Sequence, residues 1–490
     1  MIDKLRQLVR GSLIYGAGNY GVKLVGFLLI PVYTRYLTPA DYGILALVST
    51  FSRIVFIFLN LGQSTALFRF YYDKDTPDAR ERVIAGSLWI VVLFSMPLAV
   101  VILALSFPTA ALLLGEGALY PLVAIGVLTM ACRAFLRLPF AVLRANARET
   151  TYAIWSIART ALSAVLAVVL VVGVQWGVRG VLLGGLFSEA ILAVLLLPMI
   201  TGALRKGWAG PEMRAQLAFG LSLVPAGLAS FVLDLSDRFF LKHYASLEEV
   251  GLYSLGYRFG EIILFVVSAV ELAWPQFVFS NRRSERAPQL YAYATTYYIA
   301  GMLYLVLGLS MLAPEMVTLM AAPAFHRAVE VVPLIAVSEL CQGLYYVGTI
   351  GIMLMRRPLV RSVGLIVAAL VNIGLNFVLI PRYGMLGAAW ATLIAFLVEM
   401  TLLVSVALSY YPIPYQWRRM ARVLLAAGGL YAASSFLPAA SVLVTVIFKG
   451  ALLASFPIVL WLLGFFEPTE LKYAYDLASG ALKRLAPSRF

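Results

Sequence analysis

The sequence predicts an all-helical polytopic membrane protein with about fourteen transmembrane helices. Apolar residues make up 62% of the 490 positions, mean hydropathy is +0.90, and only 13% of residues are charged. A soluble domain of this length would carry more charge, whereas a protein embedded in a lipid bilayer must present apolar side chains to it. We expect two six-helix lobes, related by a pseudo-twofold axis along the membrane normal, and an appended C-terminal helix pair.

The individual helices are predicted from runs of about 20 apolar residues, the length that crosses a bilayer. Met1–Arg10 leads directly into the first of these runs, so no cleavable signal is expected. The fourteen predicted spans are 12–33, 42–66, 83–107, 118–140, 152–174, 181–200, 217–237, 250–273, 290–313, 331–353, 363–380, 387–408, 423–437 and 441–465.

The basic residues of the connecting segments predict the orientation. With the N-terminus in the cytoplasm, 25 Lys and Arg residues fall in cytoplasmic segments and six fall in outer ones. Positive loops remain inside, so both termini are expected in the cytoplasm. This distribution accounts for most of the net charge of +14, and no nucleic-acid partner is expected.

A weak internal repeat predicts the two lobes. Tyr36–Leu47 aligns with Tyr244–Leu255 at an offset of 208, and Gly177 aligns with Gly384 at an offset of 207. Two matches at nearly one offset favour parallel six-span repeats over chance similarity in leucine-rich sequence. The expected divisions are an N-lobe at 1–200, a cytoplasmic linker at 201–216, a C-lobe at 217–410, a helix pair at 411–466 and a cytoplasmic tail at 467–490.

Seven basic residues lie inside predicted spans. A cation in hydrocarbon is costly and normally faces a water-filled interior, so the cluster in the first half of the chain predicts a polar cavity for an anion. Lys449, in the last span, is open to two interpretations, the polar edge of a lipid groove or pairing with a neighbouring helix. The seven are Lys23, Arg53, Arg133, Arg137, Arg159, Arg258 and Lys449.

Residues Gly11–Leu47 contain a glycine-rich polar first span followed by a Tyr-Leu-x-Pro-x-Asp-Tyr-Gly turn. This segment resembles the opening of the polysaccharide-exporter family, which includes the Wzx-type O-antigen flippases and belongs to the multidrug/oligosaccharidyl-lipid/polysaccharide superfamily. The fourteen-span plan is similar over nearly the whole chain, and it is also similar to that of the MurJ-like lipid II flippases.

The resemblance implies a function in cell-surface polysaccharide biosynthesis at the bacterial inner membrane. Members of this family move an undecaprenyl-pyrophosphate-linked oligosaccharide from the cytoplasmic to the periplasmic leaflet by alternating access. The implied partners are that lipid-linked glycan, the lipid bilayer and the polysaccharide polymerase machinery. No cofactor is implied other than Na⁺ or H⁺ as a coupling ion.

Three cations on the spans that carry cations in MurJ-like proteins are predicted to bracket the pyrophosphate: Lys23, Arg53 and Arg258. A guanidinium offers a planar fork to phosphate oxygens, and an ammonium supplies a point charge. Arg133 and Arg159 are expected to complete the basic lining. The alternative is that these cations pair with intramembrane carboxylates or anchor helix ends, with Glu189 available in the first lobe and Glu261 next to Arg258.

A tentative sodium site is predicted in the second lobe. Asn372 and Asn376 are four residues apart on one helix face, and carboxylate, amide and hydroxyl oxygens suit a small cation. MurJ-like proteins have such a site on these spans, with a second carboxylate where this chain has asparagine. The alternative is ordinary hydrogen bonding between helices, with a salt bridge from Asp234 to Arg238. The four predicted ligands are Asp234, Asn372, Asn376 and Thr392.

Two other functions are considered. A multidrug antiporter of the same superfamily would share the lobes, but a basic cavity repels the cationic drugs that such antiporters usually carry. A membrane polymerase or ligase would need a sizeable outer loop with acid and base groups, and the longest outer segment, 314–330, contains few. We therefore predict a secondary transporter, not an enzyme.

Overall fold

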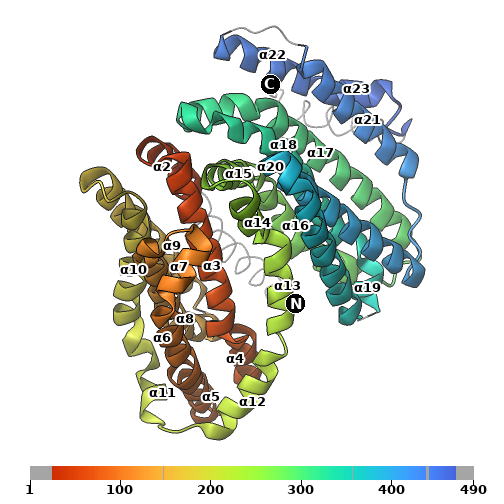
Figure 1. The fold of residues 1–490 in the computed structure, drawn as a ribbon. Coiled ribbons are helices and arrows are strands. Elements are labelled where there is room, and N and C mark those ends of the chain that lie inside the picture. The colour runs from red at the N-terminus through yellow and green to blue at the C-terminus, as the bar shows by residue number, and fades with distance from the viewer. Residues whose placement is uncertain (1–24, 147, 356, 437–440, 469, 471–490) are drawn as a thin grey trace, which may run out of the picture.

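The computed structural model describes residues 25–146, 148–355, 357–436, 441–468 and 470. These residues form helices joined by short turns, with no strand among them, which confirms the predicted fold class (Figure 1). Two groups of helices lie side by side, one coloured red to yellow and one green to blue. The last helices of the chain lie along the outside of the second group.

In the part of the chain that the structure describes, the first group contains ten α-helices. Two of them continue into short π-helical segments, α5 into 91–95 and α9 into 169–173. The helices are α2 (Ile30–Tyr36), α3 (Pro39–Asn60), α4 (Gln63–Tyr72), α5 (Pro77–Ile90), α6 (Met96–Ala104), α7 (Ser106–Leu114), α8 (Tyr120–Ala145), α9 (Glu149–Val168), α10 (Gly177–Leu196) and α11 (Thr201–Arg205).

The remainder of the described chain forms the connecting helix α12, the second group and the C-terminal helices. A 3₁₀ segment, η5 (Pro323–Val331), leads into α18. The helices are α12 (Gly210–Leu221), α13 (Val224–Leu235), α14 (Asp237–Tyr244), α15 (Leu247–Gly260), α16 (Ile263–Asn281), α17 (Ala287–Met320), α18 (Val332–Gly348), α19 (Ile350–Leu354), α20 (Pro358–Tyr410), α21 (Trp417–Ser434), α22 (Val442–Ala454) and α23 (Phe456–Leu462).

The described residues contain ten helices that are long and apolar enough to cross a membrane, or eleven if η5 and α18 form one bent span. The fourteen predicted spans are compatible with this number. The first predicted span lies mostly outside the described residues. Helix α20 covers the two predicted spans 363–380 and 387–408, and non-helical Gly384 divides it between them. Helix α21 carries three arginines in 18 residues, which lowers its apolar character.

Several predicted spans are divided between consecutive helices, and the segment 250–273 is one of them. The segment 250–273 was expected to be a single helix, but it divides between α15 and α16 at Glu261 and Ile262. Backbone bonds from Ile262 to Phe259 and from Leu264 to Glu261 have the shorter i to i−3 spacing, which tightens the turn locally.

The two repeat segments pack directly against each other. A Cβ atom built on Gly43 of α3 would lie 1.9 Å from the carbonyl oxygen of Leu247, and one built on Gly251 of α15 would lie 1.9 Å from that of Pro39. Only glycine allows two helix backbones to approach this closely. The reciprocal contact indicates that α3 and α15 are related by a twofold operation.

Both repeat helices also begin in the same way. The Thr38 hydroxyl accepts a hydrogen bond from the Asp41 backbone N–H at 3.1 Å, and the Ser246 hydroxyl accepts one from Glu249 at 3.1 Å. These side chains satisfy backbone donors that the first helical turn leaves unpaired. The aligned residues of the repeat therefore have equivalent structural functions.

The second aligned pair, Gly177 and Gly384, has a shared backbone conformation. Their φ angles are +52° and +53°, in the left-handed region that side chains disfavour. At Gly384 the chain turns toward Glu249, whose carboxylate accepts the Met385 backbone N–H at 2.7 Å. The sequence match at offset 207 therefore marks a common turn.

The segment between the groups is attached to the first group. Helix α12 packs against α4 and α5, where Gln216 is fully buried. Its amide donates to the Val83 carbonyl oxygen at 2.8 Å and accepts from the Ser87 hydroxyl. The predicted linker 201–216 thus includes α11 and the first half of a docked helix. The residues at which the two lobes begin and end remain a prediction.

Candidate substrate-binding site

Two of the cations predicted to bracket a pyrophosphate lie in the described part of the chain, and the third, Lys23, lies outside it. Arg53 is exposed on α3, between the buried residues Ser52 and Val55. Within the described residues Arg53 forms no hydrogen bond and no ion pair, and it acts electrostatically on Asp234 of α13. The Arg53 side chain thus lies away from the side of α3 that packs against its neighbours.

Arg258 reaches from the second group to the first. Its guanidinium donates to the Gly26 carbonyl oxygen at 3.4 Å and lies 5.9 Å from the centre of the Tyr42 ring. The expected alternative was a salt bridge to Glu261, and the described residues contain no such pair. Arg258 therefore lies where the two helix groups meet.

Arg133 is paired with Glu189, the carboxylate that lies within a predicted span of the first lobe. Its guanidinium contacts the same oxygen of Glu189 through two nitrogens, at 2.6 and 2.8 Å. Glu189 on α10 is buried, at 2% exposure, so the pair links α8 to α10. The pairing alternative is correct for Arg133, although 39% of its side chain stays exposed and lines a pocket.

This pocket is a cavity of about 290 Å³ inside the first helix group, and we call it the arginine pocket. Helices α3, α4, α8 and α9 supply its walls. The described residues that line it include four arginines and no carboxylate. They are Phe56, Ser64, Phe68, Arg133, Leu136, Arg137, Phe140, Ala141, Arg144, Tyr152, Ser156 and Arg159.

Three of the four guanidinium groups pack against aromatic rings. The Arg137 guanidinium lies 4.7 Å from the centre of the Phe56 ring, that of Arg144 lies 4.6 Å from Phe68, and that of Arg159 lies 5.5 Å from Phe140. A ring contacts the face of a guanidinium, whereas a phosphate binds its N–H edge. The rings therefore orient these groups for an anion.

Arg137 has two polar side-chain partners. Its guanidinium donates to the side chains of Asn60 and Ser64. Two polar partners and a ring compensate for its loss of hydration without cancelling its charge. The pocket thus keeps a net positive lining.

Arg144 is the pocket residue that the sequence reasoning missed, because it was assigned to a cytoplasmic loop. It follows Arg137 by seven residues, which is two helical turns, so both side chains lie on the same face of α8. The spacing of Arg133, Arg137 and Arg144 along one helix face could have predicted that Arg144 lines the same pocket.

The four predicted sodium ligands fall into separate contacts. The Asn376 amide donates to the Asn372 amide oxygen at 2.9 Å, and Ser236 donates to that same oxygen at 3.4 Å. The Thr392 hydroxyl lies 3.5 Å from the Tyr253 hydroxyl, which donates to Asp237. Asn372, Asn376 and Thr392 are all fully buried.

Asp234 does not join this network through its side chain within the described residues. Arg238, expected as its partner, pairs with Asp237 at 3.1 Å and contacts only the backbone carbonyl oxygen of Asp234. No group of three His, Cys, Asp or Glu side chains suited to a metal occurs in the described chain. Two buried amide atoms, Asn372 Nδ2 and Asn376 Oδ1, lack partners there. The sodium site remains a prediction.

Lys449 has one of its two expected environments. Its ammonium pairs with Glu315 of α17 at 2.6 Å, and both side chains are nearly buried. The pair joins the C-terminal helix α22 to the second group. This arrangement is pairing with a neighbouring helix, and the charge is compensated locally.

Comparison with protein families gives a match over more than half of the chain. A family model described as "Polysaccharide biosynthesis protein" matches residues 32–330. The chain is 25% identical over 281 residues to a protein of the Lsg locus of Haemophilus influenzae, covering 54% of this chain. It is 24% identical over 335 residues to the succinoglycan biosynthesis transport protein ExoT of Rhizobium meliloti, covering 67% of this chain. Each match spans 65% of the relative's length.

Solved structures show the same fold. The lipid II flippase MurJ, in an inward closed conformation, superposes with a TM-score of 0.72 at 12% identity, over 92% of this chain and 99% of that one. An inward-facing multidrug transporter of the MATE family superposes with a TM-score of 0.63 at 15% identity, over 82% of this chain and 95% of that one. At these identities the likeness establishes the architecture alone.

Proposed function

Because the chain belongs to the polysaccharide biosynthesis protein family, we propose that it is a flippase for an undecaprenyl-pyrophosphate-linked oligosaccharide. It moves this lipid from the cytoplasmic to the periplasmic leaflet of the bacterial inner membrane. The relative named as a succinoglycan biosynthesis transport protein and the flippase with a similar fold support transport of a lipid-linked glycan.

The arginine pocket is the observation that carries this proposal. Four guanidinium groups line one cavity within the membrane helices, and aromatic rings and neutral polar groups hold three of them. A pyrophosphate carries several oxygens that accept bidentate hydrogen bonds from arginine. Glu189 neutralises Arg133, but an uncompensated guanidinium such as that of Arg137 is costly in hydrocarbon unless an anion binds there.

Arg53 and Arg258 extend the basic surface beyond this pocket. The arginine pocket lies near the ends of α4, α8 and α9 that are predicted to face the cytoplasm, and Arg258 lies where the helix groups meet. In the proposed cycle the pyrophosphate first binds the arginine pocket and then passes to Arg53, Arg258 and Lys23. The lipid tail remains in the bilayer.

Transport proceeds by rocking of one helix group against the other, as in other carriers built from repeats. The cycle is reset by an inward gradient of Na⁺ or H⁺ or by the membrane potential. A charge that crosses the field contributes about 2.3 kcal/mol per 100 mV. A cation antiporter is less well supported, since the basic lining would repel its substrate.

Reconstitution tests the proposal. Liposomes that contain the protein and a fluorescent undecaprenyl-pyrophosphate glycan are scored for transbilayer movement with and without a sodium gradient. We expect Arg53→Ala and Arg159→Ala each to lower the transport rate about tenfold or more, because a charge-assisted hydrogen bond contributes about 1.5–3 kcal/mol.

The matched control is Arg327→Ala, since Arg327 is 60% exposed and outside the predicted cavity. It is expected to leave transport unchanged. Wild-type rates in Arg53→Ala and Arg159→Ala, with normal insertion and folding, would show that these arginines do not bind the headgroup.

A further inference from the structure

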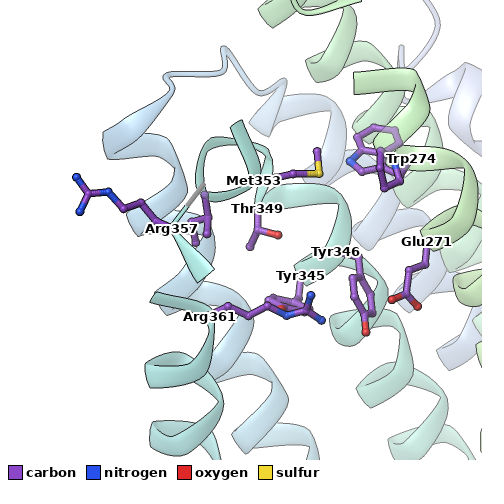
Figure 2. A pocket seen from close by; sticks show the side chains of 10 residues that line it. Glu271, Trp274, Tyr345, Tyr346, Thr349, Met353, Arg357 and Arg361 are labelled. Carbon is purple, nitrogen blue, oxygen red and sulfur yellow. The ribbon is translucent and has the colours of Figure 1, made fainter. Parts of the chain in front are cut away.

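A second pocket lies in the C-terminal helix group and has no function in the mechanism above. It is a cavity of about 360 Å³ between α16, α18, α19 and the start of α20 (Figure 2). We call it the aromatic pocket. Its lining is Glu271, Trp274, Pro275, Tyr345, Tyr346, Thr349, Ile352, Met353, Arg357 and Arg361.

The aromatic pocket is the repeat equivalent of the arginine pocket. Helices α8 and α9 meet at a turn in which the Arg148 N–H bonds to the Leu143 carbonyl oxygen, and α19 and α20 meet at a turn in which Arg357 bonds to Ile352. These two turns are related by an offset of 209, close to that of the other aligned pairs. Both pockets therefore occupy the same place in their repeats.

Their chemistry differs at the equivalent positions. Arg137 in the arginine pocket corresponds to Tyr345 at an offset of 208, and Tyr152 corresponds to Arg361 at an offset of 209. The arginine pocket has four guanidinium groups and no lining carboxylate, whereas the aromatic pocket places Glu271 opposite Arg361. One site suits a polyanion, and the other suits a ligand with hydroxyl groups and apolar faces.

The aromatic side chains supply apolar faces with polar edges. Trp274 is 8% exposed, and its indole nitrogen has no hydrogen-bond partner in the described chain. Figure 2 shows this nitrogen on the side of the ring that faces the pocket. A buried N–H without a partner is costly, so a ligand that accepts its hydrogen bond would bind favourably.

The charged groups of the pocket are already oriented. The Arg361 guanidinium lies 5.1 Å from the Tyr345 ring centre and 5.2 Å from that of Tyr346. In Figure 2 Arg361 extends toward Tyr345, Tyr346 and Glu271, whereas the guanidinium of Arg357 points away from them. Arg361 thus offers donors and Glu271 offers acceptors within one cavity.

We propose that the aromatic pocket is a carbohydrate subsite that binds a pyranose ring of the transported glycan. A pyranose has C–H faces that pack on aromatic rings and equatorial hydroxyl groups that both donate and accept hydrogen bonds. Trp274, Tyr345 and Tyr346 supply the rings, and Glu271 and Arg361 bind hydroxyl groups. This inference rests on the proposed function, and it divides the headgroup between the repeats, with phosphate in one and sugar in the other.

Binding measurements on full-length protein in nanodiscs test the subsite. The two probes are undecaprenyl pyrophosphate without sugar, and the lipid-linked oligosaccharide extracted from host cells that lack this gene. Wild-type protein is expected to bind the glycosylated lipid at least about tenfold more tightly, the effect of one or two added hydrogen bonds. Trp274→Phe and Arg361→Gln are expected to abolish that gain and to leave binding of the sugar-free lipid unchanged.

Two matched variants control for the substitutions themselves. Arg283→Gln removes an exposed arginine after α16 that does not line the aromatic pocket, and Trp390→Phe alters a tryptophan that is 48% exposed on α20. Both are expected to bind the two lipids as wild type does. Thermal unfolding of each variant in detergent reports whether it is folded.

The outcomes separate this inference from the proposed function. If wild-type protein binds neither lipid, the flippase proposal fails. If it binds both lipids equally, or if Trp274→Phe and Arg361→Gln keep the full gain from the glycan, the subsite is overturned while the flippase proposal stands. An equal loss for both lipids in these variants would also overturn it, since the residues would then only support the fold.

Discussion

The basic residues inside the helices are stabilised by three kinds of partner, and the kind of partner determines whether the charge remains available. Arg133 and Lys449 contact carboxylates, Arg137 contacts neutral polar groups, and Arg159 stacks on a phenyl ring. A carboxylate cancels the charge, whereas an amide, a hydroxyl or a ring offsets the loss of hydration without cancelling it. Arg137 and Arg159, whose partners are neutral, are the residues that an anion would bind.

Lys449 provides a test at the residue scale. We expect Lys449→Met to destabilise the protein by about 3 kcal/mol or more, because Glu315 would remain nearly buried without its partner. The measurement is thermal unfolding in detergent.

The double variant Lys449→Met with Glu315→Gln is the control, since it removes both charges. It is expected to recover most of the lost stability. If the single and double variants unfold at the same temperature, the ion pair does not hold α22 against α17.

At the scale of elements, the contact between α3 and α15 joins the two helix groups. Gly43 and Gly251 face each other's backbones, and the N-terminal ends of both helices are the ends predicted to lie outside. Arg258 on α15 reaches Tyr42 and Gly26 near the same interface. In the proposed cycle, rocking of the groups separates or rotates these helices, so we expect the size of their side chains to change the conformational equilibrium.

We expect Gly43→Ala to weaken this contact by about 1–3 kcal/mol, since the added methyl overlaps the Leu247 carbonyl oxygen. The expected result is a lower unfolding temperature and a slower transport rate in liposomes.

Gly428→Ala on α21 is the matched substitution, because nothing lies within 4 Å of its added Cβ. Alanine favours a helix over glycine, so this variant is expected to be as stable as wild type or slightly more stable. Equal behaviour of the two alanine variants would contradict a tight α3–α15 interface.

At the scale of the whole molecule, the distribution of charge predicts the orientation, and the pockets of the two helix groups differ in charge. Basic loops predict the side on which the termini lie, and the first repeat keeps a basic pocket where the second has an aromatic one.

Fusion reporters test the orientation. Green fluorescent protein fused after Phe490 is expected to fluoresce, and alkaline phosphatase fused within 314–330 is expected to be active, because the basic segments face the cytoplasm. A dark C-terminal fusion together with an inactive enzyme in the outer segment would reverse the predicted topology.

Much of the fold follows from local patterns in the sequence. Apolar runs predict the helices, because the length needed to cross a bilayer is set by its thickness. Glycines aligned at one offset predict equivalent turns, and the shared positive φ of Gly177 and Gly384 shows why glycine occurs at both. The break between α15 and α16 was not predicted: Gly260 and Glu261 lie at it, but the apolar residues on both sides together are long enough for one span.

The candidate site shows the limit of such patterns. The sequence by itself determined that the chain is a helical membrane protein with surplus basic residues in its first half, since composition and spacing are local properties. Only the tertiary structure decided that Arg133 is paired with Glu189, that Arg144 lines a pocket, and that Arg361 lies over two tyrosine rings. Those outcomes depend on which helices become neighbours, and packing between residues far apart in the chain determines that.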